Sequence, residues 1–122
     1  MNIFLNSDKE LDQVAELIFK ALGINHFWEG DSRNVLEGVY NSHSIFGINI
    51  KLELNAYDYE DEYKFMLHVK KDMVSPLKVD SSIENNVASI VLKLLYNNLD
   101  VPMAIEKRNE LLLVSQDNIF EW

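Results

Sequence analysis

Two neighbouring segments of the chain, residues 47–55 and 63–70, alternate between apolar and polar side chains. The apolar positions are Ile48, Ile50, Leu52 and Leu54 in the first segment and Tyr63, Phe65, Leu67 and Val69 in the second. A period of two sends successive side chains to opposite faces of a strand, so each segment is predicted to be a strand with one buried face. The short connection between them predicts an antiparallel hairpin.

Three further segments have weaker strand patterns. Asn34–Asn41 is predicted to join the hairpin through a turn at residues 41–44. Val101–Lys107 and Glu110–Val114 are predicted to form a second hairpin with a tight turn at residues 108–109. Together these segments predict an antiparallel sheet of about five strands.

A first helix is predicted over residues 7–22. Ser7 and Glu10 have the spacing of a capping box, and apolar residues recur behind them at helical intervals. Gly23 follows at the position where a left-handed residue commonly ends a helix.

A second helix is predicted over residues 82–98, with Ser82 as its N-cap, after a connecting loop over residues 72–82 that contains Pro76. Apolar residues occupy most of its circumference, which predicts a helix buried on most sides, with Leu94 in the core. These residues are Ile83, Val87, Ile90, Val91, Leu92, Leu94, Leu95 and Tyr96.

The expected order is therefore helix-strand-strand-strand-helix-strand-strand, an α+β fold in which two helices cover an antiparallel sheet. The chain has 122 residues, of which 48% are hydrophobic, with four Gly and two Pro. This length and composition predict one globular domain over residues 1–122.

The charge of the chain limits its partners. Lys and Arg total 11 against 20 Asp and Glu, a formal net charge of −9. Nucleic acids and anionic membranes are bound through Lys and Arg, so neither is an expected partner. The expected partner is a protein with a basic surface. We expect a cytoplasmic protein, because no secretion signal or membrane span is recognisable in the sequence.

Catalytic and cofactor chemistry is not expected. The chain has no Cys, which removes disulfides, thiol nucleophiles and thiolate metal sites. Its three histidines, His26, His43 and His68, do not have the spacing of metal ligands. The sequence also has no Gly-x-Ser-x-Gly elbow and no Gly-rich phosphate loop. We predict no catalytic residue, no metal and no cofactor.

One acidic and aromatic segment stands out at the connection of the central hairpin. It comprises Tyr57, Asp58, Tyr59, Glu60, Asp61 and Glu62, and it ends in Tyr63. Four interpretations are open: a solvated turn, a calcium or magnesium loop, paired carboxylates for acid-base catalysis, and a protein interface. A calcium loop would require a central Gly, which the segment lacks.

A second group of the same character comprises Trp28, Glu29, Asp31 and Glu37. Glu29 and Asp31 are candidate extensions of a partner-binding surface, if their strand lies beside the hairpin. Trp28 could equally belong to the core. The same alternatives of core or interface are open for Phe120 and Trp122 at the end of the chain.

Four features are taken together: the segment Gly47–Asn55, the acidic run that follows it, the length of the chain and its acidity. In these features the chain resembles the small immunity proteins of bacterial contact-dependent growth inhibition systems. The resemblance implies that the chain binds and neutralises one cognate toxin domain, often a nuclease with a basic surface. The element order also resembles acidic type III secretion effector chaperones, which bind an extended effector segment as homodimers. Those chaperones end in a third helix, for which only eight residues remain after Val114.

Overall fold

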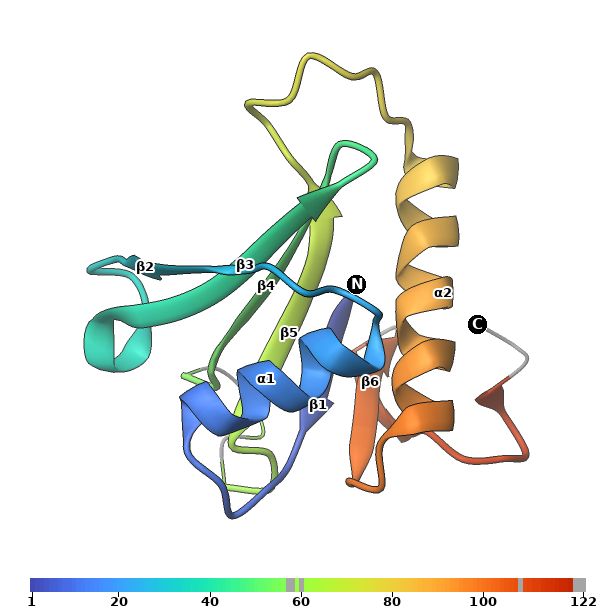
Figure 1. Cartoon of the computed structure of the whole chain (residues 1–122). Coiled ribbons are helices and arrows are strands. Elements are labelled where there is room, and N and C mark those ends of the chain that lie inside the picture. Colours follow the sequence, from blue (N-terminus) through green and yellow to red (C-terminus); the bar gives the residue numbers. More distant parts are fainter. Residues whose placement is uncertain (57–58, 60, 108, 120–122) are drawn as a thin grey trace.

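The computed structural model of the chain describes residues 1–56, 59, 61–107 and 109–119. Its centre is one seven-stranded sheet with the order β2-β3-β4-β5-β1-β6-β7, in which every paired strand is antiparallel (Figure 1). The strands are β1 (Asn2–Leu5), β2 (Trp28–Asp31), β3 (Val39–Ile45), β4 (Ile48–Leu54), β5 (Phe65–Lys71), β6 (Met103–Lys107) and β7 (Glu110–Leu113). The predicted α+β class is confirmed, with seven strands in place of about five.

The central hairpin forms as predicted, with Ile50 opposite Val69 and Leu52 opposite Leu67. The second hairpin is also confirmed, and Lys107 lies opposite Glu110 at its turn. The alternating residues of β4 and β5 bury one face of the sheet against the helices, as their period of two requires.

Two strands were missed by the sequence prediction. β1 lies in the middle of the sheet between β5 and β6, and Ile3, Phe4 and Leu5 are all buried. A strand that is covered on both faces has no alternation, and four residues are too few to reveal any period. β2 was missed because it is exposed, lies at the edge of the sheet and contains Gly30.

The strand predicted over residues 34–41 lies further along the chain than expected. Residues 36–38 form a short 3-10 turn, η1 (Leu36–Gly38), and β3 begins after it at Val39. The turn predicted at residues 41–44 is wrong, because β3 continues through it to Ile45. Phe46 and Gly47 make the turn instead, with φ values of 55° and 73°. Two residues with positive φ match the turn that twisted hairpins prefer.

The helices begin at other residues than predicted. Helix α1 (Leu11–Ala21) starts after Glu10, whose backbone N–H donates to Oε1 of Gln13 at 3.1 Å. Ser7 lies outside the helix, and its hydroxyl accepts from the backbone of Lys9. Gly23 ends the helix with φ +72°, as predicted.

Helix α2 (Ser81–Asn98) is capped by Asp80, whose Oδ1 accepts from the backbone N–H of Ile83 at 2.9 Å. Ser82 is therefore a helical residue and not the cap. No helix within the described ranges has both the length and the apolarity that crossing a membrane would require.

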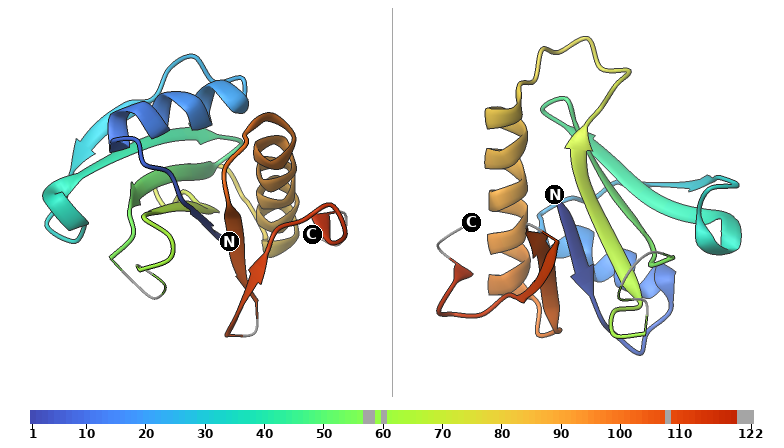
Figure 2. Two further views of the ribbon diagram at one scale, coloured as in Figure 1. Left: turned by 90° about the horizontal axis from the view of Figure 1, so that it is seen from below. Right: turned by 180° about the vertical axis from the view of Figure 1, so that it is seen from behind.

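The main core lies between the two helices and one face of the sheet, and Figure 2 shows both helices on that side. The prediction that α2 is buried on most sides is wrong. Ala88, Val91, Leu92 and Leu95 are its buried residues, while Leu94 is 38% exposed and Ile90 is 57% exposed. One face of the helix is enough to cover the strands beneath it, so the other apolar residues remain at the surface.

The opposite face of the sheet, here called the open face, has no helix over it in the described part of the chain. It carries a small second core of Phe4, Tyr63, Met66 and Ala104, onto which Tyr59 and Leu111 pack.

Candidate protein-binding surface

The described part of the acidic hairpin connection is anchored to the open face of the sheet. The side-chain amide of Asn55 donates to the carbonyl of Tyr63 at 2.9 Å, and the backbone N–H of Asn55 donates to the carbonyl of Lys64 at 2.8 Å. These bonds close the base of the connection. Tyr57, Asp58 and Glu60 lie outside the described residues.

The two described tyrosines of this connection are used inside the protein. The ring of Tyr59 meets the ring of Phe4 edge-on, with 5.5 Å between centroids. Tyr63 is buried beside the same Phe4, and burial raises the pKa of its hydroxyl, with the charge of Glu62 adding to the effect. Asp61 and Glu62 are exposed, so the connection offers carboxylates to solvent while Tyr59 contributes to packing.

The second acidic and aromatic group comes together at one edge of the sheet. Glu29 and Asp31 are exposed on β2, which pairs with β3 alone. Asp31 and Glu37 line one hollow of about 410 Å³ at the end of this strand. Among the described residues, none of these three carboxylates belongs to a salt bridge. We call Trp28, Glu29, Asp31 and Glu37 the β2 edge.

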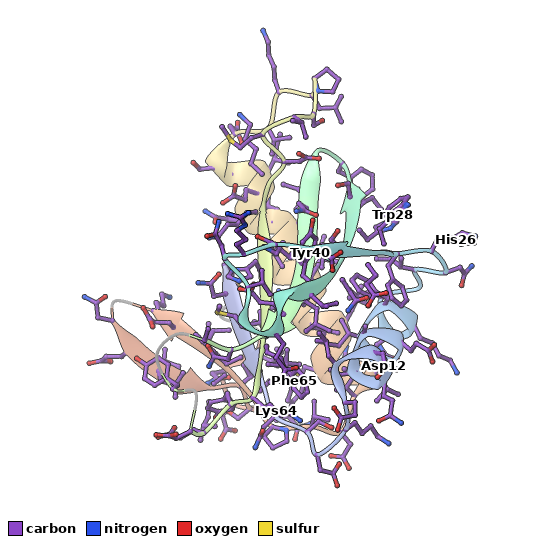
Figure 3. The ribbon with its side chains drawn as sticks, turned by 90° about the vertical axis from the view of Figure 1, so that its left-hand side faces the viewer. Asp12, His26, Trp28, Tyr40, Lys64 and Phe65 are labelled. Carbon is purple, nitrogen blue, oxygen red and sulfur yellow. The ribbon has the colours of Figure 1, made fainter. Side chains whose placement is uncertain are left out.

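Trp28 is a surface residue, and its surroundings hold it in place. Its side chain is 63% exposed, and Figure 3 places it at the periphery of the molecule. The indole stacks on the imidazole of His43, with 5.9 Å between ring centroids. Nδ1–H of His43 donates to the carbonyl of His26 at 2.8 Å, so the ring beneath Trp28 is itself fixed. His43 therefore lies in β3 as a support for Trp28, and not in a turn.

The backbone next to Trp28 is also fixed by an aromatic contact. A Cβ atom added to Gly30 would lie 2.3 Å from Cζ of Tyr40, so the tyrosine ring covers this glycine. Nζ of Lys51 lies 4.7 Å from the centre of the same ring. Only glycine lets Tyr40 lie across the edge strand in this way.

The two acidic groups lie at different places along the sheet. Tyr59 packs on Phe4 of β1, and three strands lie between β1 and β2. The connection that carries Asp61 and Glu62 joins β4 to β5, which lie two and three strand spacings from β2, or about 10–14 Å. That Glu29 and Asp31 extend the surface of this connection stays a prediction.

A polar network on the open face was not predicted from the sequence. Glu53 is 3% exposed, and its Oε1 lies 2.5 Å from Nε2 of His68. Nδ1 of His68 lies 2.9 Å from Oδ1 of Asn2, and Nζ of Lys51 lies 3.8 Å from Oε2 of Glu53. The only signal in the sequence was the placement of Glu53 and His68 at polar positions of two paired strands.

This network lines a hollow of about 360 Å³, together with Asn49, Lys70, Lys71, Asp72 and Met73. Both ring nitrogens of His68 are turned toward neighbours, so using either as a base or a metal ligand would require breaking a contact within the protein. Nowhere in the described ranges do three or more His, Asp or Glu side chains gather as metal ligands.

His68 should make the stability of the protein depend on pH. Burial lowers its pKa below the ordinary 6.5, against the opposing hydrogen bond and charge of Glu53. The unfolded chain then binds this proton more readily, so His68 destabilises the fold as pH falls below about 6.5. Urea unfolding between about pH 7.5 and 5.5 should show a smaller loss of stability in His68→Gln than in the parent protein.

The control for this experiment is His26→Gln, because His26 is exposed. It should keep the pH dependence of the parent protein. Identical pH profiles for all three proteins would contradict the assignment of this effect to His68.

Comparison of the chain with protein-family models, with curated proteins and with solved structures gives no match. The β2 edge and the open face are therefore the features of the molecule from which its function is inferred.

Proposed function

We propose that this chain is an immunity protein, which binds and neutralises a cognate toxin domain through the β2 edge. The observation that carries the proposal is Trp28, a large aromatic side chain that is 63% exposed and held against His43 beside free carboxylates. Tryptophan is among the residues that contribute most to protein interfaces when a partner covers it. A side chain that is already fixed loses less entropy on binding.

The charges of the β2 edge favour a basic partner. Glu29 and Asp31 follow the exposed tryptophan along β2, Glu37 lines a hollow with Asp31 and Arg33, and the whole chain has a net charge of −9. Such a surface accelerates encounter with a positively charged protein and disfavours acidic ones. A nuclease toxin with a basic substrate-binding surface has the expected charge. In this proposal the two proteins meet in the cytoplasm.

Asp61 and Glu62 have a secondary role in this proposal. They are exposed in the connection between β4 and β5, which lie two and three strand spacings from β2, or about 10–14 Å. A partner footprint of about 800 Å² centred on Trp28 reaches them toward its margin. We therefore expect these carboxylates to affect the rate of association and not the lifetime of the complex.

Replacing Trp28 should weaken binding strongly. Trp28→Ala is expected to raise the Kd for the cognate toxin domain by about 30-fold or more, mainly through faster dissociation. The toxin domain is sought at the C-terminus of the protein encoded immediately upstream, and surface-based kinetics measures both rates. The matched control is Leu113→Ala, which removes an exposed apolar side chain from the other edge of the sheet. Equal affinities for the two variants would contradict the proposed site.

The charges should act on association. Glu29→Gln with Asp31→Asn is expected to slow association and to flatten its dependence on salt. Asp61→Asn with Glu62→Gln should have a smaller effect of the same kind. A larger effect from the second pair would move the main contact to the hairpin connection.

One observation favours a second candidate, the secretion chaperone that binds an extended segment. β2 pairs on one side only, and a free edge strand can add a strand from another chain. The two functions differ in the state of the partner. An immunity protein binds a folded toxin domain, whereas a chaperone binds an unfolded effector segment and leaves folded domains alone.

A further inference from the structure

Helix α2 carries two separate apolar stripes. The first comprises Ala88, Val91, Leu92 and Leu95, which are buried in the main core. The second comprises Ile83, Val87, Ile90 and Leu94, and three of its members are exposed, at 41% for Ile83, 57% for Ile90 and 38% for Leu94. Val87, a member of the second stripe, is partly buried and packs against the main core. The other three residues of the second stripe are exposed, so their apolar character requires its own explanation.

The spacing of the second stripe is that of a helix-pairing seam. Its members follow one another at intervals of four, three and four residues. This alternation keeps apolar residues on a single line along a helix, as in the core positions of paired helices. Asn97 continues the line three residues after Leu94. We call these five residues the α2 seam.

The exposed residues of α2 are uncharged. They are Ser81, Ser82, Ile83, Asn85, Asn86, Ile90, Leu94, Asn97 and Asn98, whereas the two charged residues of the helix, Glu84 and Lys93, are partly buried. In the whole chain, 25% of residues are charged and acidic residues outnumber basic ones. A surface helix of 18 residues that exposes isoleucine and leucine and no fully exposed charge differs from the rest of this protein.

We propose that the α2 seam pairs with the same seam of a second copy of this chain, which makes the protein a homodimer. Two copies with a net charge of −9 each repel one another wherever acidic surfaces meet, and this uncharged helix face avoids that repulsion. A basic partner gains little from the seam, because none of its five residues carries a carboxylate. A symmetric dimer uses the same patch twice, and the repeated apolar spacing makes this patch complementary to itself.

The position of the seam permits such pairing. Figures 1 and 2 show α2 toward one side of the molecule, with α1 and the C-terminal residues 115–119 both level with its lower half, so its upper half is the less covered part. Ile90 is the middle of the seam, seven residues from Ile83 and seven from Asn97. A two-fold axis at this point brings Ile90 against the Ile90 of the second copy.

Sedimentation equilibrium of the complete chain tests the proposal. From about 1 to 500 µM, the parent protein should change from the chain mass of 14.2 kDa toward twice that mass. Ile90→Asp should raise the dimer dissociation constant by about tenfold or more, because it places a charge in the seam of each copy. Leu113→Asp is the control, since Leu113 is exposed on β7, and it should dimerise like the parent protein. A single species of 14.2 kDa at all concentrations would overturn the proposal, and so would an unchanged dissociation constant in Ile90→Asp.

A cross-link locates the contact. The chain has no Cys, so Ile90→Cys introduces the only thiol. Under mild oxidation this variant should form a disulfide-linked dimer quickly and nearly completely, while Leu113→Cys should not. Faster cross-linking through Leu113→Cys would place the contact at β7 and refute the α2 seam. Neither experiment uses a toxin, so their outcome is independent of the proposed function.

Discussion

Leu92→Ala is expected to lower the free energy of unfolding by about 2–5 kcal/mol. Leu92 is fully buried in the stripe of α2 that faces the main core. Removing its side chain loses the burial of three carbon atoms and leaves a cavity that the surrounding core only partly fills. Urea unfolding followed by circular dichroism measures the change, and a lower midpoint with an unchanged slope is the expected result.

Leu94→Ala is the matched control in the same helix. Leu94 is 38% exposed, so its truncation should cost no more than about 1 kcal/mol. Equal losses for Leu92→Ala and Leu94→Ala in dilute solution would show that α2 is turned differently about its axis. The comparison is made at low protein concentration, because the α2 seam includes Leu94.

The second large effect is expected from Glu53→Ala, which should lower the free energy of unfolding by about 2 kcal/mol. Glu53 is nearly fully buried and joins His68 to Lys51. Removing the Glu53 carboxylate leaves His68 and Lys51 without the acceptor that they share. These unsatisfied donors account for most of the expected loss in the free energy of unfolding. Chemical unfolding near neutral pH measures this change.

Glu106→Ala is the control for Glu53, because Glu106 is an exposed glutamate in β6. It should change stability by about 0.5 kcal/mol or less. If His68→Gln and Glu53→Ala act on one network, the double variant should lose less than the two single losses together. Additive losses would mean that the two side chains contribute separately.

The elements that could be predicted were those with a clear period and one buried face. β4 and β5 alternate because one face of each covers the core, and α1 has one apolar side that lies over the sheet. β1 could not be recognised, because a central strand covered on both faces is apolar without alternation. In α2, the sequence showed the apolar residues but could not separate a core stripe from a surface stripe, since both follow the helical period.

The residues of the candidate site could also be predicted only in part from the sequence. The acidic run at residues 57–62 stood out by composition, yet the described Tyr59 contributes to packing on Phe4. Trp28 gave no decisive signal, because a tryptophan in a short segment fits a core and a surface equally well. The pairing of Glu53 with His68 depends on the register of β4 and β5, which no single segment specifies.

The protein is proposed to act by stoichiometric binding of its partner, and a titration of toxin activity distinguishes this from catalysis. The complete chain is added stepwise to the cognate toxin domain, and the remaining activity is measured at each molar ratio. We predict that activity falls in proportion to the added chain and reaches zero at a fixed ratio, with the recovered toxin unchanged in mass. Full protection by strongly substoichiometric amounts of the chain, with the toxin covalently altered, would contradict this claim.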